Sequence, residues 1–159
     1  MIMSNTVQKS AAEKVEYRDK LKDVEDKIDK LTDFIRDYKN IVVYTGSQLD
    51  SNVANPKLKP GHPTKGHMAL KALMDRDLVK GVVSFNTDSL HRKSGIPKTK
   101  LIEINGNTHQ EVCEKCNMKY MRDFHTVEST TPFDHRTSRK CDNVKCGGQL
   151  HDNALHFAE

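Results

Sequence analysis

The 159-residue chain contains no tryptophan, only 6% aromatic residues and a hydrophobic fraction of 35%. No apolar run approaches the roughly 20 residues of a transmembrane helix, so membrane insertion is not expected. Residues 1–12 lack the apolar core of a secretory signal and the arginines of a mitochondrial presequence. This length and composition predict one domain with a modest core and room for an appended helix.

Neither sign of charge dominates, since 26 basic residues stand against 22 acidic ones and the net charge is +4. Basic clusters occur at 57–65 and 135–140. Phosphate binding needs a focused patch, and solvated loops are the simpler interpretation of both clusters. Nucleic acid is therefore a weakly supported partner.

A long amphipathic helix is predicted over residues 16–40, after a flexible N-terminus of residues 1–15. Its apolar residues recur at alternating steps of four and three, which places them on one helical face. They are Tyr17, Leu21, Val24, Ile28, Leu31, Ile35 and Tyr38. This spacing fits either a coiled-coil seam with a partner or a helix that packs on the chain's own sheet, and the sequence leaves both open.

Strands alternating with helices predict a partial Rossmann-like parallel α/β sheet over residues 41–110. Thr64 can cap a helix over Lys65 to Val79, after a proline-containing loop at 49–63. A final segment, 151–159, is expected to add the last strand of this unit. The β-branched or apolar runs that form the expected strands are 41–44, 82–85, 101–104 and 154–157.

The four cysteines form two close pairs in the last third of the chain, Cys113 with Cys116 and Cys141 with Cys146. Each pair offers two thiolates, and folding back the twenty-four-residue insert brings the pairs together around Zn²⁺ in a zinc-ribbon-like module over 111–150. Four thiolates leave no open coordination position, so the predicted site is structural.

Without a visible secretory signal, paired cysteines indicate a metal site rather than disulfides. An intracellular reducing compartment is therefore expected, either the cytoplasm or the nucleus, with an organelle left open. His109, His125 and His135 lie near the cysteines and are interpreted as surface residues rather than ligands.

A series of short motifs occurs in the order found in sirtuins. They are Ile41 to Gly46, Pro63 to Leu70, Phe85 to His91, Ser94 to Pro97, Asn105 to Asn107, the two cysteine pairs and His156 to Glu159. By this order and spacing, the segment from Tyr17 to Glu159 resembles the sirtuin family, and within it the branch of nuclear animal sirtuins. The resemblance implies a Rossmann-type domain, a small zinc module, and NAD-dependent deacylation of lysine or ADP-ribosyl transfer.

Several departures from the family pattern affect the catalytic positions. The family turn G-A-G-x-S, where the backbone approaches the dinucleotide, becomes Gly46 followed by S-Q-L-D. The family H-G-N becomes N-G-N, so that Asn105, an amide that accepts no proton near neutral pH, replaces the general base. The P-D-[FY]-R-G segment that closes over the cofactor is absent, and the family continues well beyond the motif with which this sequence stops.

These losses predict a catalytically degenerate sirtuin-like protein without a catalytic residue, which acts as a zinc-stabilised interaction subunit of a larger protein assembly. Gly46, Asn86 and Asp88 occupy family cofactor positions and are interpreted as vestigial, so NAD binding is not expected. The alternative is an NAD-dependent protein lysine deacylase, or an NAD-binding subunit whose site a partner completes. Asn86, Asp88 and His91 are its best support.

Overall fold

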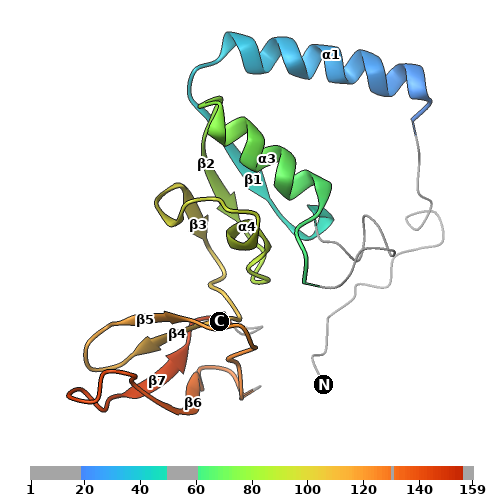
Figure 1. The fold of residues 1–159 in the computed structure, drawn as a ribbon. Helices are drawn as coiled ribbons and strands as arrows, with labels where there is room; N and C mark the ends of the chain where they lie inside the picture. Colours follow the sequence, from blue (N-terminus) through green and yellow to red (C-terminus); the bar gives the residue numbers. More distant parts are fainter. Residues whose placement is uncertain (1–18, 50–60, 130, 156–159) are drawn as a thin grey trace, which may run out of the picture. The chain divides into compact units, whose positions relative to one another are not determined.

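The computed structural model describes residues 19–49, 61–129 and 131–155 (Figure 1). The chain divides into two units, one up to Lys39 and the other from Asn40 onward. No helix among the described residues is long and apolar enough to cross a bilayer.

The first unit contains helix α1, Leu21–Asp37, which confirms the predicted helix within the described residues. Tyr17, the first residue of the predicted stripe, lies outside them. No residue of α1 is buried, and Leu21, Ile28 and Leu31 are each more than half exposed. An isolated helix of this length is only marginally stable in water, so the stripe is suited to a contact with another apolar surface.

The second unit contains a three-stranded parallel sheet of order β1-β2-β3. The strands are β1, Ile41–Thr45, β2, Val79–Ser84, and β3, Leu101–Glu103. Val43, Val82 and Leu101 pair in register across the sheet and contribute to one apolar core. The predicted parallel α/β sheet is therefore confirmed.

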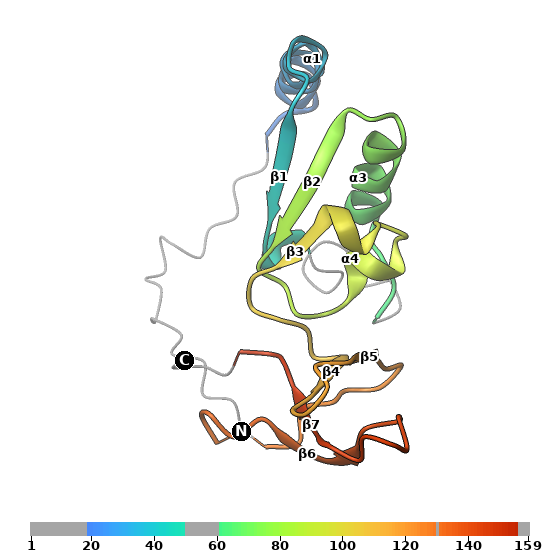
Figure 2. The same cartoon turned by 90° about the vertical axis from the view of Figure 1, so that its left-hand side faces the viewer.

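Helix α3, Lys65–Asp75, lies against one face of this sheet (Figure 2). A capping box starts it: the Thr64 side chain accepts a hydrogen bond from His67 N, and the His67 side chain accepts one from Thr64 N. The helix is shorter than predicted because Arg76 ends it and Asp77 adopts a φ of +59°. Val79, predicted as the end of the helix, instead starts β2.

Short helical turns complete the connections of this unit. They are η2, Ser47–Leu49, α4, Leu90–Lys93, and η3, Lys98–Lys100. The last two lie in the connection between β2 and β3.

The row Tyr44, Val83 and Ile102 lies on the other face of the sheet, opposite the core row. Tyr44 is 70% exposed and Ile102 is 61% exposed. Within the described residues, this apolar face therefore remains largely open to solvent.

The cysteine-containing part forms a second sheet, antiparallel, of order β5-β4-β7-β6. Its strands are β4, Gln110–Cys113, β5, Lys119–Met121, β6, Arg136–Lys140, and β7, Gln149–Asp152. The expected final strand over 154–157 is wrong where it can be followed: His151 and Asp152 pair within this second sheet, Ala154 and Leu155 lie in no strand, and 156–159 lie outside the described residues.

A buried carboxylate stabilises this small sheet in place of a large apolar core. Glu111 is fully buried, and its two oxygens accept hydrogen bonds from Arg122 Nε at 2.7 Å, Arg139 Nε at 2.6 Å and Thr137 Oγ1 at 2.9 Å. Arg139 also contacts Glu128. Because a buried charge is tolerated only when paired and hydrogen-bonded, these contacts fix the insert between the cysteine pairs onto β4.

The capping box gives a first prediction. Thr64→Ala removes the side-chain acceptor of the α3 N-terminus and should destabilise the second unit by about 1 kcal/mol. Thermal unfolding should show a decrease of a few degrees, whereas Thr32→Ala, on the surface of α1, should leave this transition unchanged. Equal melting temperatures for Thr64→Ala and the wild type would contradict the assignment.

Candidate metal centre and catalytic-motif positions

The two cysteine pairs converge, and their four Sγ atoms lie within 4.8 Å of one another. Cys113 Sγ is 3.6 Å from Cys146 Sγ, and Cys116 Sγ is 3.7 Å from Cys141 Sγ. A tetrahedron with Zn–S bonds of about 2.3 Å has sulfur–sulfur edges of about 3.8 Å. The four ligands therefore have the spacing of a tetrathiolate metal site, as predicted from the sequence.

Gly148 leaves the space that one of these sulfurs needs. A Cβ atom at this position would lie 2.6 Å from Cys113 Sγ and 3.0 Å from Lys115 Cβ. The Gly148 carbonyl also accepts a hydrogen bond from Cys141 N at 2.8 Å, which ties the second cysteine pair to the same turn. The backbone is thus shaped around the sulfur cluster, and the donor set fits Zn²⁺.

Backbone N–H groups stabilise the thiolate form of Cys113 in the first cysteine pair. Hydrogen bonds from the N–H groups of Cys116 and Lys115 outweigh burial and lower the pKa of the Cys113 thiol to about 6. Lys140, next to Cys141 in sequence, donates from its Nζ to Gln149 Oε1. A contact that the sequence did not indicate is made by Tyr120, whose hydroxyl lies 3.1 Å from Cys141 Sγ.

The nearby histidines do not join the cluster. The four cysteines form the one group of three or more metal-binding side chains found among the described residues. His109 was interpreted as a surface residue, but it is buried and its ring lies 4.6 Å from that of His125. His135 Nδ1 contacts Asp152 Oδ1 at 3.1 Å.

Asn105, at the family base position, makes two structural hydrogen bonds. Its Nδ2 donates to Phe85 O at 2.8 Å, and its backbone O accepts from Leu155 N at 2.9 Å. The following Gly106 has a φ of +70°, and an added Cβ would lie 1.6 Å from Asn153 O. The side chain thus bridges to the residue after β2 and carries no group that titrates near neutral pH.

The three candidate cofactor residues lie in two different places: Gly46 and Asn86 contact each other, and Asp88 lies at the start of α4. Asn86 Nδ2 donates to Gly46 O at 3.1 Å, so these two residues meet after the adjacent strands β2 and β1. Asp88 Oδ1 instead accepts from Leu90 N at 2.9 Å at the start of α4, while its Oδ2 is buried and has no hydrogen-bond partner among the described residues. A Cβ at Gly46 would meet no atom within 4 Å.

The turn after Gly46 places Leu49 on the start of α3. Leu49 N donates to Gly46 O at 3.0 Å, closing the turn. A Cβ at Gly66 would lie 2.5 Å from Leu49 Cδ1, so the leucine side chain packs directly on the glycine backbone. These residues border a pocket of about 400 Å³ that Val43, Ala69 and Leu70 also line.

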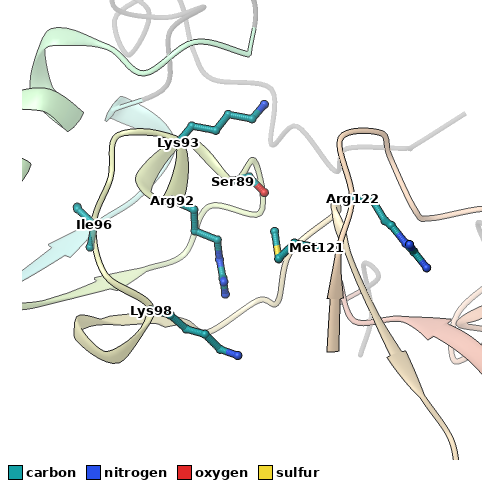
Figure 3. A pocket seen from close by; sticks show the side chains of 7 residues that line it. All are labelled: Ser89, Arg92, Lys93, Ile96, Lys98, Met121 and Arg122. Atoms are coloured by element: carbon teal, nitrogen blue, oxygen red, sulfur yellow. The ribbon is translucent and has the colours of Figure 1, made fainter. Parts of the chain in front are cut away.

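Figure 3 shows a second pocket, of about 390 Å³, with several cationic side chains. Two of these cations are already paired: Arg92 with Glu103, and Arg122 with Glu111 and Asp142. Lys93 Nζ donates to Gly61 O at 3.3 Å. The net positive charge of this pocket is therefore much smaller than its lining indicates.

Asn107 is a buried hub that the motif comparison did not single out. Its Oδ1 accepts from Ser89 Oγ at 2.7 Å and from His109 N at 2.8 Å, and its Nδ2 donates to Glu103 Oε1 at 2.6 Å. Its backbone N donates to Asn153 Oδ1 at 3.2 Å. The Asn107 side chain thus connects β3 with the loop before α4, and its backbone N–H adds the segment after β7.

His91 is buried at the start of α4, where Thr45 Oγ1 lies 2.7 Å from its Nε2. Its ring lies 4.7 Å from that of His67. Burial, followed by the proximity of His67, lowers the pKa of His91 to about 4. The buried position therefore favours the neutral imidazole of His91.

Known protein families and relatives were compared with this chain. The model of the Sir2 family matches residues 17–159. The chain belongs to the Sir2 family. NAD-dependent protein deacetylase sirtuin-7 of Bos taurus is 34% identical to this sirtuin, and the match covers 91% of the present chain. Sirtuin-7 of Homo sapiens is 35% identical, and that match covers 84% of the present chain.

The matches cover 41% of the bovine protein and 38% of the human one, so this sirtuin spans about two fifths of those relatives. A solved structure described as Sir2 bound to acetylated peptide is similar, with a TM-score of 0.54, 20% identity, and coverage of 83% of this chain and 65% of that one. At this identity the structural likeness supports the Sir2 fold alone.

The metal centre gives a second prediction. The purified chain should hold one Zn²⁺, and Gly148→Ala should lower zinc affinity at least about tenfold because the added Cβ displaces the Cys113 sulfur. Metal analysis after dialysis against a chelator measures this. Gly46→Ala, where a Cβ meets no atom, is the matched control. A well-folded wild type that holds no metal would show the assignment to be wrong.

His91 gives a third prediction. Its folded-state pKa of about 4 lies below the ordinary value of 6.5, so the unfolded chain binds more protons between these values. Stability from the neutral ring is present above pH 6.5 and is lost as the pH falls toward 4. Between pH 7 and 5 the loss should be about 2 kcal/mol.

His91→Gln, which cannot be protonated in this range, should lose about that much less stability than the wild type over the same interval. Urea unfolding at both pH values, at matched metal content, measures the difference. The same pH dependence in both proteins would contradict the role of His91.

Proposed function

We propose that this sirtuin binds Zn²⁺ through Cys113, Cys116, Cys141 and Cys146, does not catalyse deacylation by itself, and serves as an interaction subunit of a larger protein assembly. The observation that carries the proposal is the chemistry at Asn105. Its amide donates to Phe85 O and lacks a proton acceptor with a pKa near neutrality. In the proposed function, Asn105 therefore does not act as a general base.

The turn after Gly46 supports weak NAD binding at most. In Rossmann-type folds, small residues allow the backbone of this turn to approach the dinucleotide phosphates. Here Leu49 folds back onto Gly66 in the first turn of α3, and an apolar side chain stands at that helix N-terminus. Gly46, Asn86 and Asp88 are accordingly proposed as remnants of a cofactor site.

Exposed apolar surfaces support the proposed role in an assembly. The open face of the parallel sheet includes Tyr44 and Ile102, and the stripe of α1 includes Leu21 and Leu31, all more than half exposed. Such surfaces are typical of protein contacts. We place the assembly in a reducing intracellular compartment, because metal-binding thiolates must stay reduced.

Nucleic acid is a weaker candidate partner. In the basic cluster at 135–140, Arg139 is engaged by Glu111 and Glu128, and Lys140 by Gln149. The two carboxylates neutralise Arg139, and the hydrogen bond to Gln149 occupies the Lys140 ammonium group, so neither side chain is freely available for phosphate contacts.

The second candidate function is NAD-dependent protein lysine deacylation, alone or in a site completed by a partner. Relatives of 34–35% identity are named NAD-dependent protein deacetylases, which favours it. The contact between Asn86 Nδ2 and Gly46 O also keeps two family cofactor positions together. NAD binding by the isolated chain distinguishes the two candidates.

A fourth prediction follows. Calorimetry should detect no NAD binding in the micromolar range, and mass spectrometry should detect no removal of acyl groups from lysine peptides. Asn105→His alone should not restore activity, because the residues after Gly46 remain unsuited to the cofactor. A catalytically active sirtuin serves as the positive control. Nicotinamide release from NAD by the unmodified protein, dependent on an acylated peptide, would overturn the proposal in favour of the deacylase.

A further inference from the structure

Tyr120, in the middle of β5, brings its hydroxyl oxygen to 3.1 Å from Cys141 Sγ, although 21 residues separate them in sequence. The ring is half-buried and packs against the cluster formed by Cys113, Cys141 and Leu150. This contact joins the strand that follows the first cysteine pair to the first ligand of the second pair.

Arg122, the residue that follows the end of β5, fixes the position of this ring. Its guanidinium carbon lies 5.0 Å from the centroid of the Tyr120 ring, and its Nε donates to the buried Glu111 at 2.7 Å. The two terminal nitrogens donate to the Asp142 carboxylate at 2.9 and 3.0 Å. The segment from Tyr120 to Arg122 therefore holds Cys141 through the phenol and Asp142 through the guanidinium.

Metal binding determines the direction of the hydrogen bond between Tyr120 and Cys141. A sulfur that coordinates Zn²⁺ is a thiolate and has no proton to give, so the phenol must be the donor. Four thiolates around one divalent cation leave a net charge of −2, and a donor to one sulfur reduces the electron density there. Outer hydrogen bonds of this kind orient metal ligands and tune their affinity.

We infer that Tyr120 is a positioning residue of the metal centre: its hydroxyl donates to Cys141 Sγ, and this contact, braced by Arg122, slows loss of the metal. The inference rests on the proposed zinc site and names a residue outside the four ligands. The competing explanation is that Tyr120 only fills space in the small core, in which case its hydroxyl is dispensable.

The test uses the full chain loaded with Zn²⁺ and measures metal release to a chromophoric chelator. Tyr120→Phe keeps the ring and removes the hydroxyl, and it should release Zn²⁺ roughly tenfold faster. Tyr44→Phe is the matched control, because Tyr44 is 70% exposed on β1, and its release rate should equal that of the wild type.

Cobalt gives a second readout that does not depend on stability. In Co²⁺-loaded protein, loss of a donor to Cys141 Sγ should move the sulfur-to-metal charge-transfer band to lower energy, since the sulfur electrons are less stabilised. An unchanged spectrum together with an unchanged release rate in Tyr120→Phe would overturn the inference.

Two unnatural side chains of nearly equal size distinguish a hydrogen-bonding role of Tyr120 from a packing role. This comparison remains valid if Tyr120→Phe folds poorly. Replacement of Tyr120 by p-aminophenylalanine retains a donor and should preserve slow release, whereas p-methylphenylalanine should not. Equal release rates from these two proteins would assign Tyr120 to packing. If the wild type itself took up neither Zn²⁺ nor Co²⁺, the zinc proposal would fail, which is distinct from failure of the Tyr120 inference alone.

Discussion

The convergence of four sulfur atoms within 4.8 Å is the constraint around which the C-terminal part is organised. Four thiolates so close together repel one another unless a cation neutralises them, so the arrangement is stable as a metal site or with protons retained. Its sheet has strands of three to five residues and few buried apolar side chains. The buried Glu111, with two arginines on its carboxylate, replaces the apolar core that so short a segment cannot build.

The parallel sheet has a different physical basis. Val43, Val82 and Leu101 form a continuous apolar row under α3, and this core needs no metal. Asn107 then connects β3 to residues on both sides through neutral and charge-assisted hydrogen bonds. Because these contacts do not involve the side chain of Asn105, the residue at the base position can change without a cost to the core. The proposed loss of catalysis is thus compatible in physical terms with retention of the fold.

The sequence predicted the features that depend on local spacing. The metal ligands follow from two short cysteine pairs, and the three parallel strands follow from β-branched runs. The contacts of Tyr120 and Glu111 could not be predicted, because they join residues 11 to 28 positions apart through a sheet whose strand order the sequence does not reveal. The end of α3 was misplaced because the left-handed conformation of Asp77 has no distinctive sequence signal. The final strand was misplaced because His151 pairs with β4 and β6.

The turn at Gly46, rather than the base position, separates the two candidate functions most sharply. An imidazole at position 105 could donate to Phe85 O from one nitrogen and keep the other as a base, so the backbone there suits either residue. The start of α3 is more restrictive. Helix N-termini attract phosphate because their N–H groups are unpaired, yet here the Thr64 side chain already accepts from His67 N, and Leu49 packs on Gly66. A phosphate bound at this helix N-terminus would have to displace both contacts, and under the proposed function an amide-to-imidazole change at position 105 would not alter them.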